Sequence, residues 1–183
     1  SCGATLAPPA GADVVRKTVT VVFVDLVGST ALGEQLDPEA LRSVQTRYFD
    51  AARTALERHG GTVEKFIGDA VMAVFGVPML REDDALRAAR AALDLRVALE
   101  RLNAELALPS HLMLRTRTGI NTGEVVVGGE GATADQRLAT GDAVNTAARL
   151  QQAAEPGDIL VGESTRDALR SAITILTGAG VPD

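Results

Sequence analysis

Two aspartates occupy positions where a carboxylate is costly unless another group compensates its charge. Asp25 directly follows the apolar run 21–24, and Asp69 lies in the predicted bend of a hairpin. Neighbouring strands lie about 4.8 Å apart, so the two carboxylates converge if their strands pair. Carboxylates without an accompanying set of histidines or cysteines are typical of a hard-cation site, here for Mg²⁺ or Mn²⁺ with positions left open for phosphate. A bound cation would compensate the negative charge of Asp25 at the end of a buried strand.

Each aspartate taken alone also has a purely structural interpretation. Asp25 can cap the turn 28–30 that follows it, and Asp69 can be an ordinary turn residue. The pair, together with the motifs described below, favours the cation site over this alternative.

Composition argues against several other classes of site and partner. The net charge of −6 and the pI near 5.0 do not suit a surface that binds nucleic acid. Cys2 is the one cysteine and the histidines, His59 and His111, lie far apart, so we expect no disulfide, no cysteine-based zinc site and no histidine-based triad. No apolar run approaches the roughly 18 residues that span a bilayer, and residues 1–16 do not resemble a signal peptide. We therefore expect a cytoplasmic protein without a membrane segment.

The elements that would position these residues can be predicted from periodicity and from cap and turn residues. Asp37 as N-cap and Pro38 at the first helical position start a helix that ends at 59–61. The runs 61–68 and 69–76 indicate two strands that meet in a hairpin at Gly68-Asp69. The other predicted elements are strands at 17–25, 112–120, 124–129 and 158–162, a turn at 121–123, a loop at 129–136, and helices at 82–106, 141–154 and 163–170.

This order of elements predicts an α+β fold with a ferredoxin-like βαββαβ core, in which helices pack on one face of a mostly antiparallel sheet. A doubly wound parallel sheet is not expected, because the hairpin at Gly68-Asp69 interrupts any alternation of strand and helix. We divide the chain into a flexible leader or linker (1–16), one domain (17–177) and a C-terminal tail (178–183).

Four motifs occur in one order along the chain. They are VFVDLVGST, EKFIGDAVMAVFG, GINTGEVVVGG and GDAVNTAARL. Together they resemble the catalytic domain of the class III nucleotidyl cyclases, the adenylyl and guanylyl cyclases, over about residues 17–170. The loops and linkers resemble those of the bacterial, multi-domain members of that family. The resemblance implies that 17–177 is a nucleotidyl cyclase catalytic domain.

The resemblance implies a metal site and a phosphate site. The metal-binding residues would be Asp25, Leu26 and Asp69, holding two Mg²⁺ or Mn²⁺ ions that activate the ribose 3′-hydroxyl for attack on the α-phosphate. Backbone amides at the turn into the next helix would bind the β- and γ-phosphates, although a plain helix cap explains the same turn. The residues of this turn are Leu26, Val27, Gly28, Ser29 and Thr30.

Lys65 occupies the position of the purine-selecting lysine in the family. Adenine N1 is an acceptor and attracts an ammonium group, whereas guanine N1 carries a hydrogen and repels it. The second purine-reading position is Leu138, which accepts no hydrogen bond from adenine, and Thr140 is the candidate substitute if that segment is extended. Lys65 as a solvated strand residue is the alternative.

Asn145 and Arg149 are four residues apart and therefore share one face of a predicted helix. The resemblance implies that they orient the ribose and stabilise charge on the α-phosphate in the transition state. In the family this pair and the metal aspartates come from opposite subunits of a head-to-tail dimer. A chain with both halves would form a homodimer with two equivalent sites; a surface arginine beside an incidental asparagine is the alternative.

The expected activity is that of an adenylyl cyclase, a lyase that converts ATP to 3′,5′-cyclic AMP and pyrophosphate in signal transduction. A guanylyl cyclase is less expected because Lys65 does not suit guanine. The alternative from another class is a cyclase-like regulatory module that binds nucleotide or dimerises with little or no turnover. Leu138 favours that alternative, as does the absence of any lysine after Lys65 that could bind phosphate, with Arg170 as the candidate substitute.

Overall fold

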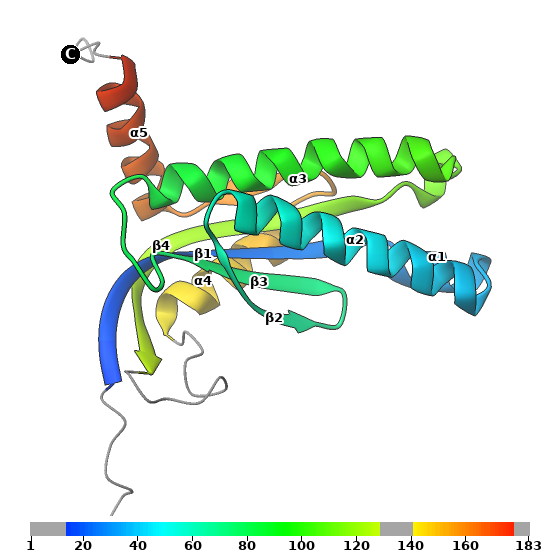
Figure 1. The fold of residues 1–183 in the computed structure, drawn as a ribbon, viewed down its shortest axis with the longest axis horizontal. Coiled ribbons are helices and arrows are strands. Elements are labelled where there is room, and N and C mark those ends of the chain that lie inside the picture. Colours follow the sequence, from blue (N-terminus) through cyan, green and yellow to red (C-terminus); the bar gives the residue numbers. More distant parts are fainter. Residues whose placement is uncertain (1–13, 129–140, 178–183) are drawn as a thin grey trace, which may run out of the picture.

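The structure is a computed structural model that describes residues 14–128 and 141–177 (Figure 1). The first strand of the chain lies at the centre of the sheet. The elements are β1 (Val14–Val27), α1 (Ser29–Gln35), α2 (Pro38–Arg58), β2 (Thr62–Ile67), β3 (Ala70–Phe75), α3 (Asp84–Leu106), a 3₁₀ turn (Ser110–Leu112), β4 (Arg115–Gly128), α4 (Asp142–Ala153), β5 (Ile159–Val161) and α5 (Glu163–Thr177). No helix in these described ranges is long and apolar enough to cross a membrane.

The sheet has the strand order β2-β3-β1-β4-β5. All neighbouring pairs are antiparallel except β4 and β5, which run parallel. The predicted α+β, ferredoxin-like fold with a mostly antiparallel sheet is therefore confirmed.

Helices cover both faces of the sheet, so the prediction that they lie on one face was wrong. α2 and α3 pack on one face against a cluster that includes Val22 and Val24, whereas α4 packs on the other against Val21 and Phe23 (Figure 1). Side chains alternate between the faces of a strand, and the run 21–24 of β1 is apolar at both sets of positions and buried on both faces.

β4 is one continuous strand, so the predicted turn at 121–123 does not form. Residues from Arg115 to Gly128 pair with β1 without interruption. Asn121 is buried, and its side chain donates from Nδ2 to the carbonyl oxygen of Ala143 in α4 at 3.3 Å. A Cβ atom at Gly123 would lie 3.0 Å from the Cβ atom of Ala143. The polar and glycine residues that resembled a turn therefore serve the packing of α4 on the strand.

The predicted start of the long second helix is confirmed. Asp37 accepts hydrogen bonds at Oδ1 from the backbone amides of Glu39 at 3.0 Å and Ala40 at 2.9 Å, and Pro38 occupies the first turn of α2. The short helix α1 was not predicted. β1 begins already at Val14, inside the segment predicted as a leader, and the division into 1–16, 17–177 and 178–183 itself stays a prediction.

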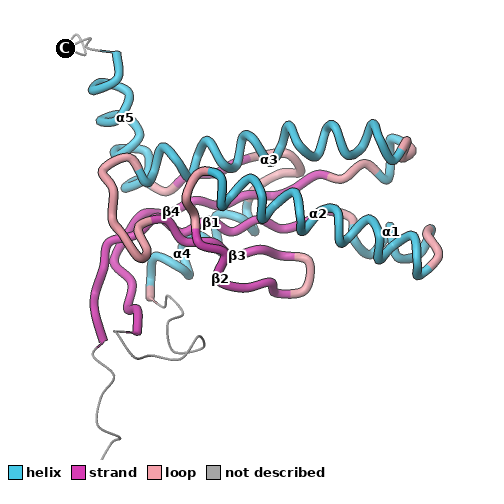
Figure 2. The backbone as a smooth tube through the Cα atoms, viewed as in Figure 1, coloured by secondary structure: helices cyan, strands magenta, loops and turns pink. Residues whose placement is uncertain are grey.

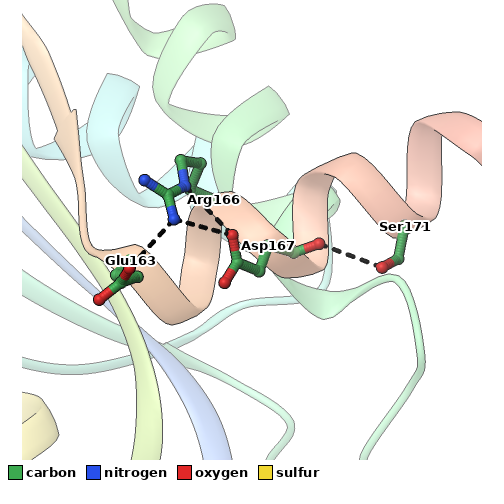
Figure 3. A network of polar contacts seen from close by, with 4 residues as sticks. All are labelled: Glu163, Arg166, Asp167 and Ser171. Atoms are coloured by element: carbon green, nitrogen blue, oxygen red, sulfur yellow. Dashed lines mark hydrogen bonds and ion pairs between the residues drawn. The ribbon is translucent and has the colours of Figure 1, made fainter. Parts of the chain in front are cut away.

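The first turns of α5 carry a small network of exposed polar groups (Figure 3). Arg166 forms ion pairs with Glu163 at 3.2 Å and with Asp167 at 3.1 Å, and Ser171 donates to the backbone oxygen of Asp167 at 3.1 Å. All these bonds lie within α5, so they connect no other element to this helix. Exposed ion pairs of this kind contribute little to the stability of the fold.

Candidate active site

Asp25 and Asp69 lie side by side at one end of the β1–β3 pair. The register aligns Asp25 with Ala70, which follows Asp69 of the hairpin turn between β2 and β3 (Figure 2). The two carboxyl groups are close enough for a hydrogen bond when one is protonated. Burial raises the pKa of Asp25, and the negative charge of Asp69 raises it further. The carboxylates thus converge, whereas their role as metal ligands stays a prediction.

The donor groups at this point fit a divalent cation. Among the described residues neither carboxylate forms an ion pair with lysine or arginine, and no group of three or more acidic, histidine or cysteine side chains occurs. Leu26 can add only its backbone carbonyl, because its side chain is apolar and buried. Two carboxylates and a carbonyl are hard oxygen donors, too few to enclose Mg²⁺ or Mn²⁺, so phosphate oxygens can complete the coordination.

Two side chains from other elements flank Asp25. Gln151 of α4 donates from Nε2 to Asp25 Oδ2 at 3.3 Å. Arg117 stands opposite Asp25 in the β1–β4 register. Its positive charge offsets part of the rise in the pKa of Asp25 that burial and Asp69 cause. Arg117 Nε is buried and has no hydrogen-bond partner within the described part of the chain. A guanidinium held there is well suited to a phosphate group.

Sequence reasoning missed Arg117. The alternation in 115–119 indicates that Arg117 and Gly119 share a face of the strand, and this was the available signal. Asp25 lies on the same face because of the register between β1 and β4. These strands are distant in the sequence, and alternation within one strand does not determine their register.

The turn after β1 has the geometry of a helix entry. Gly28 precedes α1 with φ 80°, a left-handed conformation that favours glycine, and its carbonyl accepts from the amide of Leu32 at 3.0 Å. The amides of Ser29 and Thr30 therefore precede the first hydrogen bond of the helix. Leu26 and Val27 belong to the end of β1, so the predicted phosphate-binding segment spans a strand end and a helix start.

Lys65 lies on the same face of the sheet as Asp25. It pairs with Met72 of β3, which in turn pairs with Phe23 of β1, two residues before Asp25. Directly opposed residues point to the same face. The neighbouring Phe66 points to the other face, where its ring lies 5.0 Å from that of Phe49 in α2.

Asn145 and Arg149 lie on the exposed side of α4. The buried side of this helix carries Ala143, Ala147 and Gln151, which face the sheet. Arg149 donates from an Nη atom to Thr146 Oγ1 at 3.3 Å. Within one chain the two predicted transition-state residues therefore share a face of α4, but this face is turned away from Asp25.

The two remaining predicted purine-binding residues, Leu138 and Thr140, lie outside the described residues.

Comparison with known proteins identifies the family. A family model described as the adenylate and guanylate cyclase catalytic domain matches residues 14–178. The chain therefore belongs to this family, and the resemblance to class III nucleotidyl cyclases is confirmed.

Relatives of both nucleotide specificities are similar to the chain. Adenylate cyclase 1 of Rhizobium meliloti (strain 1021) is 36% identical over 137 residues, which cover 74% of this chain and 21% of that protein. The crystal structure of the adenylyl cyclase CyaB from P. aeruginosa matches with a TM-score of 0.79 and 34% identity, covering 87% of this chain and 83% of that one. The guanylyl cyclase Cya2 matches with a TM-score of 0.74 and 34% identity over 87% of this chain and 80% of that one. The chain spans about a fifth of the length of the Rhizobium relative.

Proposed function

We propose that this domain is an adenylyl cyclase that converts ATP to 3′,5′-cyclic AMP and pyrophosphate. The observation that carries the proposal is the adjacency of Asp25 and Asp69, with Lys65 on the same face of the sheet. The carboxylates supply a site for the triphosphate and its cations, and the lysine supplies a group that distinguishes adenine from guanine.

Asp25, Asp69 and the carbonyl of Leu26 would hold two Mg²⁺ or Mn²⁺ ions. When bound, such ions neutralise phosphate charge and lower the pKa of the ribose 3′-hydroxyl, so that no protein base is required. Arg117 would contact a phosphate group, because its guanidinium stands opposite Asp25 and its Nε lacks a partner among the described residues. The amides at 28–30 would bind further phosphate oxygens at the start of α1.

Lys65 would donate to adenine N1, an acceptor that guanine lacks at this position. Leu138 cannot accept from the adenine amino group, and Thr140 would take that role. Replacing Thr140 with valine should then lower turnover of ATP without affecting the fold, and an unchanged rate would discard this part of the proposal.

Asn145 and Arg149 would orient the ribose and stabilise charge on the α-phosphate in a second copy of the chain. Both are exposed on α4 and face away from their own carboxylate pair, so a head-to-tail homodimer would bring them to the partner's nucleotide. Loss of one such donor costs about 2.7–4 kcal/mol of transition-state stabilisation, or about 10²–10³ in kcat.

The test measures cyclic product from ATP and from GTP with Mg²⁺ and with Mn²⁺. Cyclic AMP should dominate, and Asp25→Asn or Asp69→Asn should abolish it. Cyclic GMP as the main product would refute the assignment to ATP while leaving the cyclase chemistry in place.

Mixing two inactive variants tests the shared site. Asp25→Asn and Asn145→Ala damage different halves, so random pairing should restore about a quarter of wild-type activity through heterodimers with one intact site. A mixture of Asp25→Asn with Asp69→Asn is the matched control and should stay inactive, because both variants damage the same half. Equal activity of the two mixtures would exclude the head-to-tail arrangement.

A second candidate function is a regulatory module that binds nucleotide with little turnover. The apolar Leu138 and the absence of lysine after Lys65 favour it. Calorimetry that detects ATP binding in a preparation without product formation would select this function over the cyclase.

A further inference from the structure

Gln151 is the polar exception on the buried side of α4. The other buried residues of this helix are the alanines Ala143 and Ala147. Gln151 is only 8% exposed, whereas the neighbouring Gln152 is exposed. A glutamine loses rotamer freedom and hydration when it is buried, so its amide needs a hydrogen-bond partner at such a position.

The partner of Gln151 is a carboxylate of another element. Gln151 Nε2 donates to Asp25 Oδ2 at 3.3 Å, which joins α4 to the end of β1. Asp25 lies on the face of the sheet that α4 covers, because it alternates with Val21 and Phe23. The one long polar side chain on the buried side of α4 therefore contacts a residue of the candidate active site.

Gly119 determines the distance over which Gln151 reaches. A Cβ atom at Gly119 would overlap the carbonyl oxygen of Ala147 and the amide nitrogen of Gln151, so the backbone of α4 lies directly on this glycine. Gly119 stands opposite Phe23, two residues before Asp25 along β1. Two residues of a strand span about 7 Å, which the long side chain of a glutamine helps to bridge.

An amide suits this position because it carries no charge. Asp25 already has Asp69 beside it and Arg117 opposite it. A third carboxylate would add repulsion, and a second cationic side chain would compete with a divalent ion for Asp25. The amide of Gln151 holds the carboxylate without either effect.

We propose that Gln151 is a positioning residue whose amide holds one oxygen of Asp25, so that this carboxylate keeps the orientation in which it binds a cation together with Asp69. The inference rests on the proposed function, because it takes this pair as the cation site. Donors of this kind orient metal ligands, and their loss lowers metal affinity or activity about 10–100-fold. Gln151 acts through Asp25 and does not contact the nucleotide.

Gln151→Met tests the inference because it removes the donor and keeps the length and approximate volume of the side chain. Binding of Mn²⁺ to the nucleotide-free protein can be measured by electron paramagnetic resonance, which detects the free ion. The Kd should rise about 10–100-fold. The urea midpoint should change little, since the volume is conserved and Asp25 is only partly buried, so that water can replace the amide.

Gln152→Met is the matched control, because it makes the same change one residue along α4 at an exposed position. This variant should bind Mn²⁺ as the wild type does. In the activity assay Gln151→Met should need about 10–100-fold more Mg²⁺ for half-maximal rate, whereas KM for ATP at saturating Mg²⁺ should change little.

The amide of Gln151 also gives a signal that does not depend on activity. In protein labelled with ¹⁵N in its glutamine side chains, Gln151→Met identifies the Gln151 resonance by its loss. Titration with Mg²⁺ alone should shift this resonance along a saturable curve and leave that of Gln152 in place. Asp25→Asn should remove the shift.

The outcomes separate this inference from the proposed function. An active wild type whose Gln151→Met variant binds Mn²⁺ with unchanged affinity would overturn the inference and leave the cyclase intact. Equal loss of affinity in Gln152→Met, or a Gln151 resonance that ignores Mg²⁺, would also overturn it. An inactive wild type in which Mn²⁺ binding requires Asp25 and is weakened by Gln151→Met would refute the cyclase and support the inference.

Discussion

Gly119→Ala should displace α4 from the sheet and disconnect it from Asp25. A Cβ atom at Gly119 would overlap the carbonyl oxygen of Ala147 and the amide nitrogen of Gln151, and would lie 3.0 Å from Gln151 Cα. These are backbone atoms of a helix, which cannot rotate away, so the cost lies at the upper end of the about 1–3 kcal/mol typical of an overpacked core. At about 2–4 °C per kcal/mol, the expected loss in melting temperature is readily measured.

The rate of cyclic-product formation should fall further than the loss of folded protein alone explains. The reason is that the Gln151–Asp25 hydrogen bond of 3.3 Å depends on the packing of α4 against Gly119. Urea denaturation followed by circular dichroism gives the stability, and cyclic-product formation gives the activity. Gly33→Ala in α1 is the matched control, since its Cβ atom would meet Leu41 Cδ2 at an ordinary 3.6 Å. That change should stabilise the protein by about 0.5–1 kcal/mol. If both variants were equally stable and active, the close packing of α4 on β4 would be refuted.

Three further predictions concern the cation, a buried amide and a half-buried carboxylate. Saturating Mg²⁺ at about 100 times its Kd should stabilise the wild type by about 2.7 kcal/mol in calorimetry and leave Asp25→Asn unchanged. Asn103→Leu should cost at least about 1–3 kcal/mol in urea denaturation, because Asn103 pairs with both the amide of Leu114 at 2.7 Å and its carbonyl at 3.0 Å. Burial raises the pKa of Glu64, with Lys65 acting against it, so the charged form opposes folding above the ordinary pKa. Glu64→Gln should therefore raise the melting temperature near pH 7 and have little effect near pH 4, and the reverse order would contradict this sign.

The hairpin at Gly68-Asp69 could be predicted from the sequence because its signals are local. Two apolar runs of strand length meet at a glycine that has φ 62°, and the turn between them brings Asp69 to the end of the β1–β3 pair. The start of α2 was predictable for the same reason, since Asp37 and its two amide donors lie within one turn.

The continuity of β4 and the two covered faces could not be predicted in this way. Asn121 and Gly123 have the residue types of a turn, but they pair with Val21 and Val19 of β1, and α4 packs against them. The unbroken apolar run of β1 indicated that both faces of the strand are buried. It does not identify the helix that covers each face. Arg117 was missed because its proximity to Asp25 follows from the β1–β4 register.

The hydrogen bond from Gln151 to Asp25 has a consequence for a paired molecule. α4 touches its own chain's carboxylate through its inner side and presents Asn145 and Arg149 on its outer side. In a head-to-tail dimer, α4 would therefore line the nucleotide pocket at its own chain's Asp25 and also the nucleotide pocket of the partner chain. If occupation of one pocket moves α4 against Asp25, the same movement reaches the other pocket, and we expect the two pockets to bind nucleotide with unequal affinities.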